Sequence, residues 1–256
     1  MKNAINWKLF SVLLVAGVVT GFMVMPYVLA LSPTHRHFFT PVVIATQIIQ
    51  FFVIFSIAIF FGLYLGKRVG LRAPILEGLL KGEKKGAPLK SIFGVSIGAG
   101  VLASGLIILF SLLYPALSLS LLKTEAAIPV WKTFFASFYG GIAEEILMRL
   151  FFMTLLVWIF FKIKKTAEGR PTAAGVWLAI VAASVIFGLG HLPITGDLTT
   201  LTPAVVVRAV LLNGLAGIIF GWLYWKKGLE SAMLAHFSAD IVLHVILPTI
   251  AASVMR

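Results

Sequence analysis

The chain has 256 residues, of which 60% are hydrophobic and only 12% are charged, and it contains no cysteine. Soluble domains average about 45–50% apolar and about 25% charged residues, so this composition excludes a soluble globular protein and indicates an integral membrane protein. The missing cysteines exclude disulfides, thiol catalysis and cysteine-ligated metals. In a membrane protein a net charge of +12 reports orientation first, and no nucleic-acid partner is expected.

Seven apolar runs follow one another along the chain, each longer than the about 18–20 residues that a helix needs to cross hydrocarbon. Lipid offers no partners to free backbone groups, so these runs must be helical. The sequence therefore predicts an all-α, polytopic transmembrane helical bundle of about seven to eight spans. The runs lie at 9–31, 39–65, 91–117, 130–161, 172–192, 203–225 and 229–254.

Basic residues gather in alternate connections between these runs. Fifteen lysines and arginines fall in one set of connections and the N-terminal segment, and three fall in the other set. Cytoplasmic loops carry the excess of lysine and arginine, so we expect a cytoplasmic N-terminus. We divide the chain into N-terminal transmembrane helices at 1–125 (spans 1–3), with a basic cytoplasmic loop near 66–90, and a core at 126–256 that holds most intramembrane polar residues.

Two adjacent acids, Glu144 and Glu145, interrupt the run from Val130 to Phe161. Ionised side chains are costly in hydrocarbon, so intramembrane acids are rare and usually functional. Arg149 lies four residues after Glu145 and can pair with it on one helical face, whereas Glu144 points about 100° away. A structural ion pair would need only one acid, so the second acid indicates a general base or acid.

Histidines and a further acid interrupt two later runs. His191 ends the fifth run in F-G-L-G-H, and H-F-S-A-D places His236 and Asp240 four residues apart on one helical face. Each group also has a structural explanation. His191 could anchor its helix at the membrane interface, and His236 and Asp240 could simply form a hydrogen-bonded pair. His244 lies four residues further along the same face, where a supporting role is conceivable.

Two glycine pairs predict close helix packing rather than chemistry. Gly94 with Gly98 and Gly217 with Gly221 have G-x-x-x-G spacing, which lets helix backbones approach each other.

Together these residues have the chemistry needed to activate a water and to hold an oxyanion, as hydrolysis of a peptide bond requires. The same side chains could ligate a divalent metal such as zinc, with Glu144, His191, His236 and Asp240 as candidates, although neither H-E-x-x-H nor E-x-x-H occurs. No cofactor is certain from the sequence. A non-catalytic scaffold or bacteriocin-immunity protein and a proton-coupled transporter are alternatives, but no repeated pair of broken helices supports the transporter.

Three motifs carry a resemblance to a known family. E-E-I-L-M-R at 144–149, F-G-L-G-H at 187–191 and H-F-S-A-D at 236–240 resemble, in order, the E-E-x-x-x-R, F-x-x-x-H and H-x-x-x-[N/D] motifs of the CPBP (Abi) family. That family contains CAAX proteases, bacteriocin-processing enzymes and the type II CAAX prenyl endopeptidase. The resemblance implies an intramembrane endopeptidase, described for many members as a metalloprotease, with a membrane-anchored protein or peptide as substrate. We expect it in the plasma (inner) membrane of a prokaryote, surrounded by lipid.

The resemblance also implies roles for the candidate catalytic residues. Glu144 would activate water with help from His191, Glu145 and Arg149 would fix the site, and His236 and Asp240 would hold the oxyanion or the water. Asp240 stands where some members have asparagine, and a carboxylate donates no hydrogen bond unless it is protonated.

If their helices were straight, His191 and His236 would lie at different depths in the membrane. At about 1.5 Å per residue, His191 lies about 28 Å from a helix start near Thr172, and His236 lies about 10 Å into its span. Either one helix begins well outside the membrane, or tilted and broken helices make up the difference.

Overall fold

A computed structural model describes residues 5–32, 40–82 and 89–254 as a bundle of helices. The N-terminal helices are α1 (Trp7–Met23), α2 (Met25–Leu31), α3 (Pro41–Val69), α4 (Pro74–Leu80), α5 (Leu89–Ser111) and α6 (Pro115–Ala126). The remaining α-helices are α7 (Val130–Phe138), α8 (Thr154–Ile163), α9 (Ala173–Gly190), α10 (Leu192–Leu198), α11 (Pro203–Lys227), α12 (Leu229–Asp240) and α13 (Leu247–Val254). Three π-helical segments, η2 (Tyr139–Glu144), η3 (Ile146–Met153) and η4 (Ile241–Ile246), connect α7 to α8 and α12 to α13.

Seven of the resulting helical stretches are long and apolar enough to cross a membrane, so the predicted all-α transmembrane bundle is confirmed. Within the described ranges the only pairing of extended backbone is a single bridge between Lys165 and Pro171. The third predicted run is shorter than expected, because its helix ends at Ser111 and α6 follows separately. The second run is longer, since α3 continues to Val69.

The basic loop predicted near 66–90 is partly helical. Its first residues belong to α3, Gly70 ends that helix with a φ of 80°, and α4 follows. Residues 83–88 of the loop lie outside the described residues. The division into 1–125 and 126–256 remains a prediction, and the two parts pack together: a Cβ added at Gly62 of α3 would lie 2.6 Å from the Leu150 carbonyl oxygen of η3.

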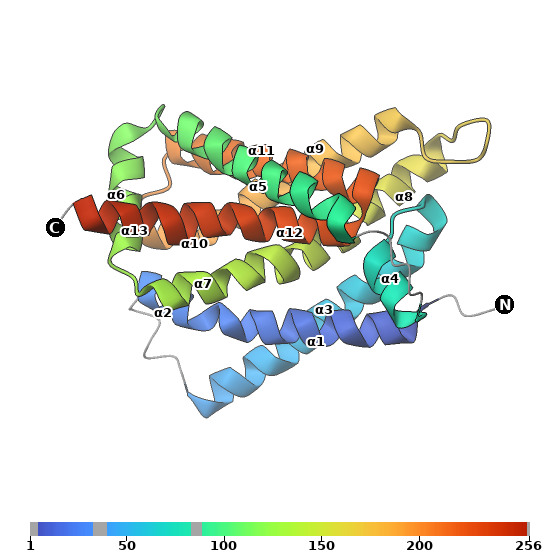
Figure 1. The fold of residues 1–256 in the computed structure, drawn as a ribbon, viewed down its shortest axis with the longest axis horizontal. Coiled ribbons are helices and arrows are strands. Elements are labelled where there is room, and N and C mark those ends of the chain that lie inside the picture. The colour runs from blue at the N-terminus through green and yellow to red at the C-terminus, as the bar shows by residue number, and fades with distance from the viewer. Residues whose placement is uncertain (1–4, 33–39, 83–88, 255–256) are drawn as a thin grey trace.

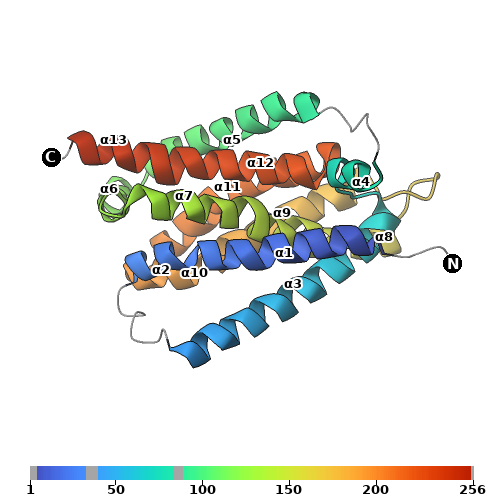
Figure 2. The same ribbon diagram turned by 60° about the horizontal axis from the view of Figure 1, so that its bottom comes forward.

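The bundle has two ends with different character (Figures 1 and 2). We call one the basic end: α4 and the hairpin between α8 and α9 lie there, and Lys67, Arg68, Lys226 and Lys227 occupy the adjoining last turns of α3 and α11. We call the other the opposite end, where α2, α6, α10 and α13 lie in both views.

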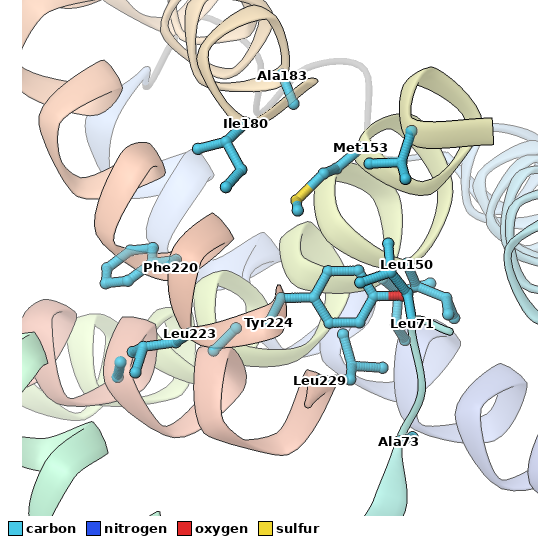
Figure 3. Close-up of a cluster of buried hydrophobic side chains, with 14 of the residues drawn as sticks. Leu71, Ala73, Leu150, Met153, Ile180, Ala183, Phe220, Leu223, Tyr224 and Leu229 are labelled. Carbon is cyan, nitrogen blue, oxygen red and sulfur yellow. The ribbon is translucent and has the colours of Figure 1, made fainter. Parts of the chain in front are cut away.

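The buried core is best developed toward the basic end. Figure 3 shows Phe220, Leu223 and Tyr224 of α11 gathered with Met153 of η3 and Leu229 at the start of α12, and all five side chains are almost completely buried. At the opposite end, α6, α10 and η4 contain no buried residue. This asymmetry places a solid apolar layer on one side of the polar residues described below.

The two predicted glycine pairs have different outcomes. A Cβ at Gly217 would lie 2.8 Å from the Ser184 hydroxyl and one at Gly221 would lie 3.1 Å from Ile180, so this pair lets α11 approach α9 closely. A Cβ added at Gly94 or Gly98 would meet no atom of the described residues within 4 Å, so the prediction for that pair is wrong. Their helix α5 packs on α12 through a different small residue, Gly100, where an added Cβ would lie 2.3 Å from the Ala235 carbonyl oxygen.

Candidate active site

The adjacent acids lie where the helix from α7 to α8 widens. Glu144 ends η2, and Glu145 separates it from η3. Single π-turns inside helices often mark functional sites, because the wider turn redirects side chains. Here Arg149 is directed toward α9 and α11, whereas Glu144 and Glu145 both approach His236 of α12.

Glu145 and Arg149 form the ion pair expected from their spacing. Oε1 of Glu145 lies 3.1 Å from Nη1 of Arg149, and the two side chains are 0% and 2% exposed. The guanidinium donates a hydrogen bond to the Gly217 carbonyl oxygen at 3.1 Å and lies against the rings of Phe187 and Phe220, at 5.1 and 5.5 Å. An ionised pair can remain buried only with such compensation, so Arg149 fixes Glu145 in one position.

His236 completes this buried cluster from α12. Its Nδ1 lies 2.8 Å from the same Oε1 of Glu145, and its ring stacks on Phe220 with centroids 4.7 Å apart. An ionised carboxylate only accepts hydrogen bonds, so Nδ1 carries the proton of this contact. The arrangement turns the other ring nitrogen, Nε2, away from Glu145.

Glu144 and Asp240 both face Nε2 of His236. Oε2 of Glu144 lies 3.7 Å away and Oδ1 of Asp240 lies 3.6 Å away, and these side chains are 21% and 13% exposed. Gly140 makes this convergence possible, since a Cβ there would lie only 2.0 Å from Oδ2 of Asp240. Separations just above 3.5 Å suit groups that share a bridging water.

His191 lies at the edge of the cluster. Its Nδ1 is 2.9 Å from the Phe187 carbonyl oxygen, which leaves Nε2 as an acceptor. The ring contacts Phe187, which also contacts the ring of His236 at 5.6 Å, and His191 lies within electrostatic range of Asp240. Among the described residues no hydrogen bond or ion pair joins His191 to Glu144.

The depth mismatch between the histidines is resolved by where α9 begins. Phe187, one turn before His191, touches the ring of His236, although about 22 Å of helix precede it in α9 and only about 10 Å precede His236 in α12. The hairpin between α8 and α9 extends beyond the neighbouring start of α12 (Figures 1 and 2). α9 therefore begins further toward the basic end than α12 does, which brings Phe187 and His236 to the same level.

The metal candidates do not converge as a complete ligand set. Glu144, His236 and Asp240 approach one another and His191 stands apart, and over residues 5–32, 40–82 and 89–254 no group of three or more histidine or carboxylate side chains has an arrangement that could hold a metal ion. The residues therefore do not fit a resident zinc, and no step below passes through one.

Some residues near the site gave no signal in the sequence. Phe220 is one aromatic residue in an apolar run, yet it supports both Arg149 and His236. Glu125 accepts hydrogen bonds at one oxygen from the hydroxyl of Tyr27 and from Nδ1 of His244. His244 therefore does have a partner of its own, but it comes from α6, far from the motifs in sequence.

Comparison with known proteins gives one match. Residues 126–242 match the family model described as "Type II CAAX prenyl endopeptidase Rce1-like". No curated protein and no solved structure matches the chain. The matched region contains Glu144, Glu145, Arg149, His191, His236 and Asp240, the residues that carry the motifs. This match, over a little under half of the chain, supports the resemblance to the CPBP family of CAAX-protease-like membrane proteins.

Proposed function

We propose that the chain hydrolyses a peptide bond of a membrane-associated protein or peptide by means of a water activated by Glu144. The match to the Rce1-like family model supports a membrane protease of the CAAX type, and seven apolar helices support an integral membrane protein. The identity of the base, the absence of a metal step and the source of the substrate belong to the proposal.

One observation carries the assignment of the base: the two glutamates have different surroundings. Glu145 is completely buried and its Oε1 is engaged by Arg149 and His236. Glu144 is partly exposed and faces Nε2 of His236 and, beyond it, Asp240. A carboxylate that must take a proton from water has to be free to contact that water, so Glu144 is the base and Glu145 is a positioning residue.

The arrangement supports a complete proton cycle. Glu144 takes a proton from a water held near His236 and Asp240 while the water oxygen attacks the peptide carbonyl carbon. The tetrahedral intermediate carries its negative charge on the former carbonyl oxygen, where Nε2–H of His236 in its doubly protonated, imidazolium form would stabilise it. Collapse breaks the C–N bond, and Glu144 returns the proton to the leaving amine.

His236 and His191 have separate tasks in this scheme. The imidazole of His236 is fixed by Glu145 at Nδ1, so that Nε2 is aimed at the reacting atoms. His191 has its Nδ1 on the Phe187 carbonyl, and its Nε2 is available to accept a proton at the edge of the site. Asp240 accepts from the water when ionised, which suits water binding better than direct contact with the oxyanion.

The experiment that tests this function is cleavage of a panel of membrane-anchored peptides by purified wild type, Glu144→Gln and Glu168→Gln, with and without a chelator. General-base catalysis contributes about 10²- to 10⁴-fold, so Glu144→Gln should lose at least about a hundredfold in kcat while remaining folded. Glu168, in the exposed hairpin after α8, is the matched control and should behave as wild type.

The possible results distinguish a glutamate-dependent protease from a metalloprotease and from a non-catalytic scaffold. Cleavage that survives the chelator and is lost in Glu144→Gln supports the proposal. Loss with chelator and recovery with added zinc would instead require a metal. Retained cleavage in Glu144→Gln would refute Glu144 as the base, and a Glu144→Ala, His191→Ala double variant that keeps biological function would favour a scaffold.

A further inference from the structure

The site is closed toward the basic end. Phe220 stacks on His236, and from there Leu223 and Tyr224 continue along α11 toward Lys226 and Lys227 at the basic end. These three side chains pack with Met153 and Leu229 (Figure 3). None of the five is more than 1% exposed. Interiors packed at this density contain few spaces larger than a water molecule. A peptide chain could not pass through this layer without unfolding it.

Exposure rises in the other direction along one face of α12 and η4. His236, Asp240 and His244 succeed one another at intervals of four residues, and their side chains are 7%, 13% and 38% exposed. Side chains with this spacing line one strip of a helix. The strip therefore leads from the closed layer, past the reacting atoms, to a more open region.

That open region is a cavity of about 400 Å³ at the opposite end. His244 lines it together with Glu125, Pro129, Thr133 and Ala252, so the connection between α6 and α7 forms one wall and α13 forms the other. Ligand pockets in proteins begin at about 300 Å³, so the space suits a few residues of an extended peptide. His244 lines this cavity and is also the last residue of the strip.

The lining suits an uncharged, mostly apolar segment. The hydroxyls of Thr133 and Thr249 donate to carbonyl oxygens of their own helices, and the carboxylate of Glu125 is engaged by His244 and Tyr27. Polar groups that are already satisfied offer little to a charged ligand. The remaining lining is dominated by alanine, proline, valine and isoleucine side chains.

We propose that an extended, apolar segment of the substrate peptide occupies this cavity and reaches Glu144 from the opposite end of the bundle, along the strip of His244 and Asp240. The inference rests on the proposed function for its chemistry, but the access route is a separate property. With the orientation predicted from the basic residues, the opposite end faces away from the cytoplasm. The substrate class is then a membrane-anchored peptide with its cleavage region on the extracytoplasmic side.

The chain lacks cysteine, so single-cysteine variants of the full-length protein report access directly. Glu144→Cys is reconstituted in sealed vesicles and treated from one side with a membrane-impermeant methanethiosulfonate. Lys123→Cys in α6 and Lys165→Cys in the hairpin after α8 identify which end faces the reagent. The labelling rate is then measured with Ala252→Trp, which fills the cavity, and with the matched control Ala174→Trp on the exposed face of α9.

We expect Glu144→Cys to react from the side that labels Lys123→Cys, with its rate lowered at least about tenfold by Ala252→Trp and unchanged by Ala174→Trp. Labelling from the side of Lys165→Cys, no effect of Ala252→Trp, or no labelling while Lys123→Cys reacts would each overturn the route. Asp240→Cys replaces Glu144→Cys if that variant elutes as an aggregate. Labelling needs no cleavage, so a failed peptide panel with directional labelling would refute the protease function and leave the route standing.

Discussion

His236 and His244 lie two turns apart on one face of a continuous helix, and their surroundings differ sharply. His236 stacks on Phe220, contacts Phe187 in a T-shaped arrangement, and is held at Nδ1 by the buried Glu145. His244 has one carboxylate partner, Glu125, and borders a cavity. The comparison separates the two requirements of an intramembrane hydrolase: a rigid half that positions the reacting groups and an open half that admits water and peptide.

The rigid half uses buried charge where a soluble core would use apolar packing. The pair of Glu145 and Arg149 is surrounded by aromatic rings and by the Gly217 carbonyl, and it ties η3 to α11 and α12. Such a pair adds little net stability compared with apolar residues, but the loss of one partner is costly. The two halves should therefore respond differently to substitution of their polar residues.

The largest expected effect is that of Arg149→Met. It leaves the carboxylate of Glu145 buried without its cation, which costs about 3–5 kcal/mol. For a chain of this size that corresponds to a decrease in unfolding temperature on the order of 10 °C. Thermal unfolding of the purified protein in detergent measures it, with Glu144→Gln as a control expected to stay within about 1 kcal/mol of wild type. Equal stability of Arg149→Met and wild type would contradict the rigid-half assignment.

A smaller loss is expected from Gly140→Ala, at the boundary between the halves. The added Cβ would lie 2.0 Å from Oδ2 of Asp240 and 3.2 Å from Nε2 of His236, so the Asp240 carboxylate must rotate or η2 must shift. Overpacking of this kind costs about 1–3 kcal/mol, and we expect kcat to fall more than KM rises because the reacting groups move. Gly94→Ala, at an exposed position of α5 with open space around it, is the matched control. Unchanged kcat in Gly140→Ala would show that Asp240 does not act at this position.

The sequence was sufficient for the features that depend on local pattern. Seven apolar runs predicted seven spans, and the spacing of Glu145 and Arg149 predicted their ion pair. The predicted pairing of His236 with Asp240 is present only as an approach at 3.6 Å, because Nδ1 of the histidine is taken by Glu145. That contact, like the support from Phe220, joins helices far apart in the chain, and no periodicity specifies which helices become neighbours.

The sequence could not distinguish the two glycine pairs for the same reason. G-x-x-x-G spacing allows a close approach but does not supply a partner, so Gly217 and Gly221 contact α9, while a Cβ at Gly94 or Gly98 would meet none of the described residues within 4 Å. The sequence did predict that Glu144 and Glu145 have different surroundings, because adjacent residues point about 100° apart around a helix. The π-helical turns that set their actual directions leave no recognisable signal in the sequence.

The smallest expected effect tests the open half through Glu125. Burial opposes ionisation of Glu125, but the charge and hydrogen bond of His244 and the hydrogen bond of Tyr27 outweigh it, so the pKa of Glu125 is lowered from its ordinary value of 4.5. A lowered pKa in the folded state contributes stability above the unfolded pKa and loses it as the pH falls through the folded value. In His244→Gln the burial is no longer offset by the imidazolium, so the pKa of Glu125 rises, its protonation costs the folded state less, and the stability lost on acidification shrinks. At pH 7 the variant should lose about 1 kcal/mol, since His244 is partly exposed.

Unfolding temperatures from pH 7 to pH 3 measure this difference. The stability deficit of His244→Gln relative to wild type should be largest at pH 7 and shrink as the pH falls, whereas Glu168→Gln, which removes an exposed carboxylate, should follow wild type. A deficit that is the same at pH 7 and at pH 3 would mean that Glu125 and His244 do not interact as a charged pair. Because this pair borders the cavity and not the reacting atoms, His244→Gln should change KM more than kcat. A change confined to kcat would instead show that His244 belongs to the rigid half, which positions the reacting groups.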